Sequence, residues 1–387
     1  MDVLLVFIGF LVVMKTKNKE KFMKNKPIVL LIHGMGTHPT GNITKEFKKG
    51  LSESASYLEL TGFEPDKEFE FQEFNYSEYF DKKRLEISDE AEFLTEYMAA
   101  GPYFLQRLIS FQSKIKDDKS LYTHWLDVIF YCLLGTLRET ILARCMEKIL
   151  SVLKEAKDHP DSYKEVIIVG HSLGTSVLHD SLTKLYLRPS EPDRADHIRF
   201  SNYPIDGLWT IANVSRLTYL LTRLEDPNTS IVRDHNNLHD GVSHFFYPVY
   251  NQYDPFTIFN RYSVDPQVGD LIRTNEIRKI DDSELSVNPH DLVEYMADPE
   301  VGGVFLSEFS SFNIGMNQIQ KAKTAYRKTT ISGPISDQYS TIKKALKELE
   351  VQTNQGASTK RLVTLTIEIF ELIKEAYDLM KNLKAKG

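Results

Sequence analysis

The sequence predicts an α/β fold with a mostly parallel central sheet flanked by helices. Two short runs, Ile28–Ile32 and Val166–Val169, are apolar throughout and do not alternate with polar residues. Uninterrupted apolar runs of this length are typical of strands buried on both faces of a parallel sheet. Stretches between and around them, such as 43–60 and Ile141–Leu153, have the spacing of amphipathic helices, and strands that alternate with helices indicate a parallel sheet.

Three further stretches have the composition of strands: Phe69–Tyr76, Leu208–Ala212 and His244–Tyr253. The last is rich in aromatic residues and contains Pro248. Because proline cannot donate a backbone hydrogen bond, we expect this strand to lie near an edge of the sheet rather than at its centre.

A five-residue turn, GHSLG at 170–174, directly follows the second apolar run and precedes a predicted helix. A strand, a G-x-S-x-G turn and a helix in this order form a nucleophile elbow, which exposes a serine hydroxyl above the sheet. Gly170 and Gly174 lack a Cβ, so neighbouring backbone can approach the turn closely. We therefore predict that Ser172 is a nucleophile and that the N–H of Leu173, at the amino end of the helix, donates to an oxyanion.

A glycine-containing loop follows the first apolar run and has the sequence His33-Gly34-Met35-Gly36. Its glycines allow the backbone N–H of Met35 to point toward the carbonyl oxygen of an acyl substrate. Met35 is therefore the second predicted oxyanion donor. For His33 we expect a role in orienting the loop backbone rather than a chemical role.

The carboxylate that orients a catalytic histidine should lie in a loop directly after a strand that follows the elbow. Asp254 meets this expectation, because it ends the aromatic stretch and because Pro255 keeps its backbone out of the helical region. Three other aspartates remain as alternatives: Asp206 precedes a strand, Asp226 follows a helix, and Asp240 lies in a polar loop.

The histidine follows the serine and the acid in the chain order expected after such an elbow. His290 is the only histidine after Asp254 in the sequence. It lies in a loop before a short predicted helix that starts near Leu292. We therefore predict a catalytic triad of Ser172, Asp254 and His290; the alternative is that His290 is an ordinary surface residue.

The chain divides into three parts. Residues 1–26 form an apolar and basic head, 27–330 form the α/β domain, and 331–387 form a helical extension. Within the α/β domain, the stretch from about 77 to 160 is a long, mostly helical insertion. Its first part, 77–120, is a candidate lid, whereas we interpret Trp125–Leu153 as helix that packs on the sheet.

The last predicted helix, Leu362–Leu383, carries a narrow apolar stripe at spacings of three, four and seven residues. A stripe of this width can pack back on the α/β domain or pair with a second copy of the chain. We favour packing back and keep self-association through this helix as the alternative.

The head combines an apolar run, Val3–Val13, with a series of lysines that follow it. The run is shorter than the ~20 residues of a spanning helix, and it has neither the leading charges nor the cleavage site of a signal peptide. One interpretation is that translation begins at Met14 or Met23; the other is a weakly membrane-associating head. The lysines after the run favour a cytoplasmic location for the catalytic body.

The composition bears on several other classes of function. The net charge of −7 gives no basis for binding nucleic acid. Cys132 and Cys145 lie in one predicted helical region at a spacing that separates them by about 20 Å, too far for a disulfide, which fits a reducing compartment. The sequence has no cysteine and histidine cluster with metal-ligand spacing, and we expect no cofactor.

These motifs together resemble the α/β-hydrolase superfamily. They are Ile28–Ile32 with its His-Gly-x-Gly loop, the V-G-H-S-L-G-T turn, Asp254-Pro255 and His290. The turn is similar to that of lipase-like and GPI-inositol-deacylase-like serine esterases. The resemblance covers roughly residues 27–300 and implies a serine hydrolase that cleaves carboxylic esters of small molecules or lipids through an acyl-enzyme, with no metal.

Two alternatives to a serine esterase stay open at the level of sequence. Thioesterases and transacylases share the same elbow and the same triad, so the motifs do not separate them from esterases. A fold of this kind can also serve as a non-catalytic protein that binds a lipid or a protein partner.

Overall fold

The computed structural model describes residues 25–34, 39–81, 127–158, 163–232, 241–257, 272–278, 290–329 and 340–375, with short gaps inside several of these ranges. Several sequence predictions lie outside the described residues and stay predictions. They concern the head up to residue 24, the donor Met35, the lid candidate from residue 82 onward and the alternative acid Asp240.

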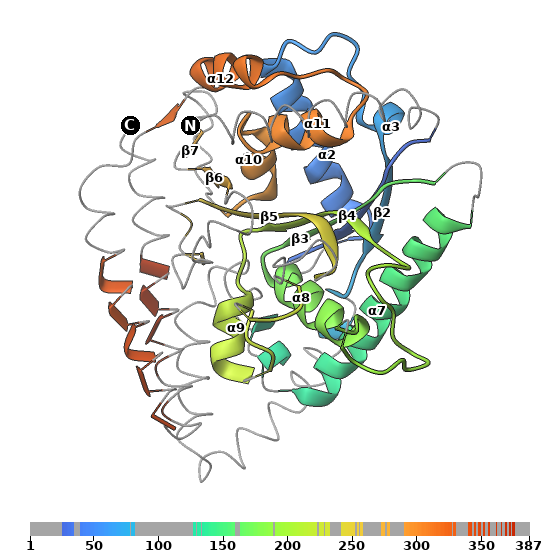
Figure 1. The fold of residues 1–387 in the computed structure, drawn as a ribbon. Coiled ribbons are helices and arrows are strands. Elements are labelled where there is room, and N and C mark those ends of the chain that lie inside the picture. The colour runs from blue at the N-terminus through green and yellow to red at the C-terminus, as the bar shows by residue number, and fades with distance from the viewer. Residues whose placement is uncertain are drawn as a thin grey trace, which may run out of the picture.

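Six parallel strands form the central sheet, which confirms the expected α/β class (Figure 1). Their order is β2-β1-β3-β4-β5-β6, and every neighbouring pair is parallel. The carboxyl ends of all six strands therefore lie at the same edge of the sheet. The strands are β1 (Ile28–Ile32), β2 (Glu70–Phe74), β3 (Val166–His171), β4 (Ile205–Ile211), β5 (Ser243–Asn251) and β6 (Ile272–Thr274).

Strand β1 is buried along its whole length because both faces of the sheet are covered. Leu30 belongs to the apolar cluster on one face, whereas the next residue, Leu31, belongs to the cluster on the other. This burial on two sides explains why the run lacks polar alternation. The register pairs Ile32 with Gly170 of β3, so the loop that begins at His33 lies beside the elbow.

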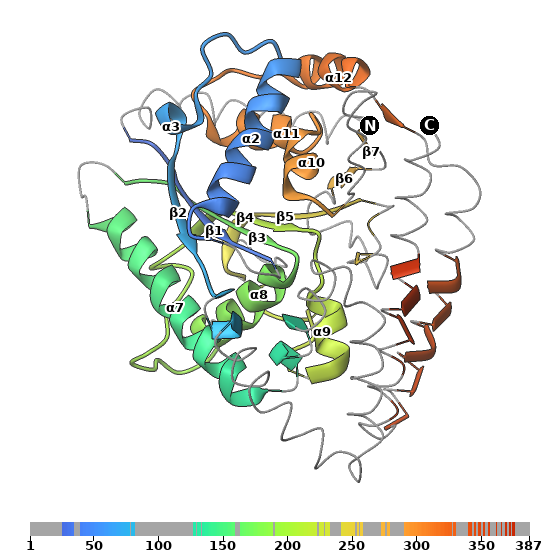
Figure 2. The same ribbon diagram turned by 180° about the vertical axis from the view of Figure 1, so that it is seen from behind.

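Helices cover the two faces of the sheet in separate layers, as Figures 1 and 2 show from opposite sides. One layer consists of α7 (Gly135–Lys157), α8 (Leu173–Leu185) and α9 (Ser215–Thr222). The other contains α2 (Asn42–Tyr57), α10 (Leu292–Ala297), α11 (Gly302–Phe309) and α12 (Met316–Ala325). The short helix α3 (Pro65–Glu68) precedes β2, and β7 (Ile277–Arg278) pairs antiparallel with β8 (Lys328–Thr329) outside the main sheet.

The aromatic strand β5 lies one strand in from the edge formed by β6. Only its last residues, Val249–Asn251, pair with β6, and Pro248 precedes them. Pro248, which has no N–H, therefore lies before the stretch of β5 that pairs with the edge strand. The position of β5 next to the edge agrees with the prediction for this strand.

The helical region that contains both cysteines is interrupted, contrary to the expectation of one continuous region. Residues 130–132 are helical, but α7 begins only after Leu134, whose φ of −94° and ψ of 82° break the helix. Seven side chains of α7 are buried, so the interpretation of its region as a sheet-packing helix is confirmed. Cys132 and Cys145 are both free and buried, and burial raises the pKa of the Cys145 thiol to about 12.

The described part of the C-terminal extension packs against the α/β domain. Ile342, Leu349, Leu365 and Ile369 are fully or almost fully buried in the same apolar cluster as α7 and α8. This is the arrangement that we favoured for the apolar stripe; the stripe beyond residue 375 lies outside the described residues. Within the part of the chain that the structure describes, no helix is both long and apolar enough to cross a membrane.

Truncation of Ile369 tests whether the extension is part of the core. Because Ile369 is 0% exposed, we expect Ile369→Ala to lower the free energy of unfolding by about 2–5 kcal/mol through lost burial and a new cavity. Urea unfolding measures this loss, which should not depend on protein concentration. The control Val351→Ala, at a position that is 42% exposed, should leave stability nearly unchanged. Equal stability of the two variants would contradict the packing.

Candidate active site

The elbow places Ser172 between the end of β3 and the start of α8 in a strained backbone conformation, with φ 54° and ψ −126°. Left-handed φ values of this kind cost a non-glycine residue about 1–3 kcal/mol. Three hydrogen bonds hold the turn. The N–H of Ser172 donates to the carbonyl of Ile211 in β4 at 3.0 Å, the Thr175 hydroxyl donates to the carbonyl of Ser172 at 2.6 Å, and that hydroxyl accepts the N–H of Val214 at 3.0 Å.

Glycines surround Ser172 because other backbone lies too close for a Cβ. A Cβ on Gly174 would collide with the carbonyl oxygens of Ile32 and His33 at the end of β1, and one on Gly170 would lie 3.1 Å from Thr175. The structure adds Gly34 to this set, since a Cβ there would lie 2.8 Å from the Cβ of Ser172. The G-x-S-x-G spacing is thus a consequence of how tightly β1, β3 and α8 meet.

Three side chains meet in a line above the carboxyl edge of the sheet. The Ser172 hydroxyl donates to Nε2 of His290, with 2.7 Å between Oγ and Nε2. Nδ1 of His290 donates to Oδ2 of Asp254 at 2.8 Å. Ser172 is 1% exposed, His290 7% and Asp254 0%. The fold therefore brings together the three residues that the sequence pattern selected, in the tautomer that leaves Nε2 free to accept a proton.

Asp254 is the one of the four candidate aspartates that contacts His290 in the described structure. Besides that contact, its Oδ1 accepts the N–H of Phe256 at 2.9 Å, and its Oδ2 accepts the hydroxyl of Tyr295 at 2.8 Å. Asp206 lies at the opposite end of the strands, where it accepts the N–H of Val166, the first residue of β3. Burial raises the pKa of Asp206 above its ordinary value.

Of the two predicted oxyanion donors, the structure describes Leu173. Leu173 is the first residue of α8, so its N–H lies at the positive end of the helix dipole. Met35 lies outside the described residues, but Gly34, its neighbour, is packed against Ser172. The loop is fixed at this point, because the Tyr76 hydroxyl donates to the carbonyl of Gly34 at 2.9 Å.

His33 orients the loop backbone, as we expected. Its Nδ1 donates to the carbonyl of Gly34 at 2.6 Å, and its Nε2 accepts the N–H of Tyr76 at 2.9 Å. The imidazole ring also stacks on the Tyr76 ring, with 4.1 Å between centroids. Both ring nitrogens are therefore engaged in holding the end of β1 against the segment that follows β2.

Two residues of this region were not selected by the sequence analysis. Tyr295 in α10 contacts Asp254, and His171, the second residue of the elbow, donates from Nε2 to the backbone carbonyl of His290 at 2.9 Å. Their contacts arise only when α10 packs beside the ends of β3 and β5. No spacing rule in a single sequence relates Tyr295 or His171 to the serine, acid and histidine.

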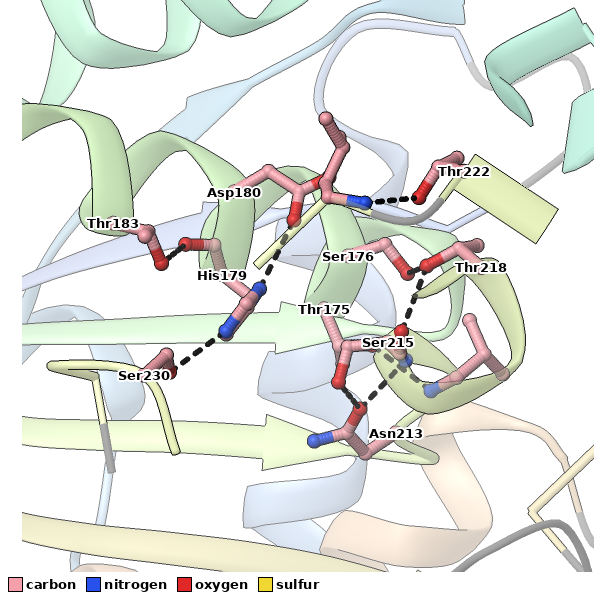
Figure 3. A network of polar contacts seen from close by, with 12 residues as sticks. Thr175, Ser176, His179, Asp180, Thr183, Asn213, Ser215, Thr218, Thr222 and Ser230 are labelled. Carbon is pink, nitrogen blue, oxygen red and sulfur yellow. Dashed lines mark hydrogen bonds and ion pairs between the residues drawn. The ribbon is translucent and has the colours of Figure 1, made fainter. Parts of the chain in front are cut away.

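A second serine, histidine and aspartate set involves the helix that follows the elbow, with His179 and Asp180 on α8 and Ser230 outside it (Figure 3). In it, His179 Nδ1 lies 3.0 Å from Oδ1 of Asp180, and Nε2 lies 2.9 Å from Oγ of Ser230. The Tyr131 hydroxyl donates to the other oxygen of Asp180 at 2.5 Å. This second polar set ties α8 to residues 130–132 and 229–232. Within the described residues 229–232, Ser230 lies among turn residues, whereas Ser172 directly precedes α8.

Comparisons with protein-family models, curated proteins and solved structures find no match to this chain. The class is therefore defined by fold and site alone: an α/β protein with a parallel sheet that carries a serine, histidine and aspartate at its carboxyl edge. Across the described residues, no group of three or more histidine, cysteine, aspartate or glutamate side chains could hold a metal ion.

Substitution of Gly174 tests how closely the elbow is packed. The Cβ of alanine would collide with backbone oxygens, which cannot rotate away, so we expect Gly174→Ala to lower the free energy of unfolding by about 1–3 kcal/mol. Chemical denaturation measures the loss. Gly315→Ala is the matched control, because an added Cβ there meets nothing within 4 Å. A Gly174→Ala variant as stable as this control would contradict the geometry.

Proposed function

We propose that the protein is a serine hydrolase of the α/β-hydrolase type, which cleaves carboxylic esters through an acyl-enzyme. The observation that supports this most directly is a pair of hydrogen bonds that links the three side chains. Ser172 Oγ lies 2.7 Å from Nε2 of His290, and Nδ1 of His290 lies 2.8 Å from Oδ2 of Asp254. The position of Ser172 on a strained turn at the amino end of α8 adds to the support, since this turn presents a serine to substrate.

The chemistry follows from the tautomer of His290. Nε2 accepts the Ser172 proton as Oγ attacks the ester carbonyl carbon, and the carbonyl electrons move to oxygen. The N–H of Leu173 donates to this oxyanion, and Met35 is the expected second donor. Donors of this kind contribute on the order of 3 kcal/mol each in serine hydrolases.

The oxyanion then collapses and the bond to the leaving alcohol breaks, with the Nε2 proton passing to the alcohol oxygen. Water subsequently gives its proton to Nε2 and attacks the acyl carbon. The second oxyanion then collapses, the bond from the acyl carbon to Oγ breaks, and the Nε2 proton passes to Oγ, which releases a carboxylic acid and restores Ser172 and neutral His290. Throughout the cycle Asp254 keeps the Nδ1 proton in place and stabilises the imidazolium. The N–H of Phe256 and the hydroxyl of Tyr295 also donate to this carboxylate.

Covalent labelling distinguishes the elbow serine from the serine of the second polar set. Both have a histidine and an aspartate at hydrogen-bond distance, but only Ser172 lies on an elbow. We expect a fluorophosphonate probe to label the wild-type protein and Ser230→Ala, and to leave Ser172→Ala unlabelled and inactive on model esters. Labelling that persists in Ser172→Ala would sink the proposal, as would a wild-type protein inert to the probe.

The acid is tested by a substitution that keeps its shape. Asparagine at position 254 carries no negative charge to accept the Nδ1–H of His290. It favours the tautomer of His290 whose proton is on Nε2, which cannot accept the Ser172 proton. We expect Asp254→Asn to lower kcat on a model ester on the order of 10⁴-fold, with an unchanged circular dichroism spectrum. Asp226→Asn, the control, should keep the wild-type rate; a large loss there instead would show that Asp254 is not the acid.

A further inference from the structure

Tyr295 is a buried residue that contacts the acid from the helix that follows the histidine. It is 1% exposed and lies five positions after His290, in α10. Its hydroxyl donates to Oδ2 of Asp254 at 2.8 Å and accepts the N–H of Asn251, the last residue of β5, at 2.8 Å. The hydroxyl therefore joins β5, the acid and α10 at one atom.

The hydroxyl shares an acceptor with the histidine. Oδ2 of Asp254 accepts from both His290 Nδ1 and the Tyr295 hydroxyl, whereas Oδ1 accepts from the N–H of Phe256. A carboxylate in a fully buried place depends on such donors, because no water replaces them. Burial, with the Asp254 charge adding to it, raises the pKa of Tyr295 well above its ordinary value, so the hydroxyl remains a donor.

We infer that Tyr295 is a positioning residue for the acid: it holds the Asp254 carboxylate in line with His290 and draws part of the negative charge away from the histidine. The inference rests on the proposed serine hydrolase function. Tyr295 acts through Asp254, to which its hydroxyl donates.

The helix that carries Tyr295 also fixes His290. Asp291, the N-cap of α10, accepts the N–H of Val293 at 2.9 Å, and the backbone carbonyl of His290 accepts Nε2–H of His171 at 2.9 Å. His290 and the hydroxyl that orients its acid are therefore set by one short helix. A shift of α10 relative to β5 would therefore displace both residues from Asp254, which follows β5.

Loss of the hydroxyl has a defined electrostatic consequence. Two titratable side chains among the described residues lie against the Asp254 and His290 pair: Tyr295 from α10 and His171 from β3. Without the donor, Oδ2 carries more negative charge, which stabilises the imidazolium form of His290. The acidic limb of kcat/KM should then move to higher pH, because the neutral imidazole that accepts the Ser172 proton forms only at higher pH.

The test is Tyr295→Phe, which removes one oxygen and keeps the ring. We expect kcat to fall about 10- to 100-fold, the range for losing a hydrogen bond to a charged group, with KM unchanged and the acidic limb moved to higher pH. Tyr186→Phe is the matched control, since its buried hydroxyl donates to the carbonyl of Tyr203 at 2.6 Å. It lies past the far end of α8 and should alter stability but neither kcat nor the pH profile.

A second measurement does not require catalysis. In histidine-labelled protein, the Nδ1 proton resonance of His290, assigned by its absence in His290→Gln, should move downfield in Tyr295→Phe, because Oδ2 becomes the stronger acceptor. The inference would be overturned if Tyr295→Phe left the Nδ1 resonance unmoved and had the same pH profile as the wild type or Tyr186→Phe. It would also be overturned if the acidic limb of kcat/KM in Tyr295→Phe moved to lower pH. A moved resonance in a protein inert to fluorophosphonate would support the role of Tyr295 and refute the proposed function.

Discussion

The backbone of Ser172, held at φ 54° and ψ −126°, is the constraint on which the rest of the site depends. The serine cannot relax because its N–H is bonded to β4 and its carbonyl to Thr175. Strand β1, buried along its length, and β3, buried up to Gly170, supply the rigidity that keeps this strain in place. One consequence is that positions 174 and 34 are glycines. A Cβ on Gly174 would collide with the backbone at the end of β1, and a Cβ on Gly34 would lie too close to Ser172.

The parallel sheet brings chemically distinct residues to a single edge. Ser172 follows β3, Asp254 follows β5, and the His33 loop follows β1. His290 comes from the layer that includes α10, on the face opposite α8. The site is thus assembled across the sheet from both layers, and its alignment depends on how α10 is anchored to β5 through Tyr295 and Asn251. Packing of this helix is as much a part of the site as the elbow.

The sequence was informative where burial or steric limits leave few choices. The apolar runs at 28–32 and 166–169 could be predicted as strands because both faces of the sheet are covered. The elbow could be predicted because a Cβ at position 170 or 174 would lie too close to neighbouring atoms. His290 followed from chain order. By contrast, Tyr295 and the break at Leu134 could not be predicted. The first depends on how a helix packs against strands far away in the chain, and the second interrupts a stretch whose composition is helical on both sides.

The second polar set shows why distances between side chains do not by themselves define a nucleophile. Ser230, His179 and Asp180 have nearly the spacing of Ser172, His290 and Asp254, and Tyr131 donates to Asp180 as Tyr295 does to Asp254. What differs is the backbone. His179 and Asp180 are consecutive residues within a regular helix, and Ser230 lies among the turn residues 229–232. Ser172, by contrast, directly precedes α8, so its backbone adjoins the positive end of a helix dipole. Matching distances among three side chains are therefore not sufficient to define a nucleophile.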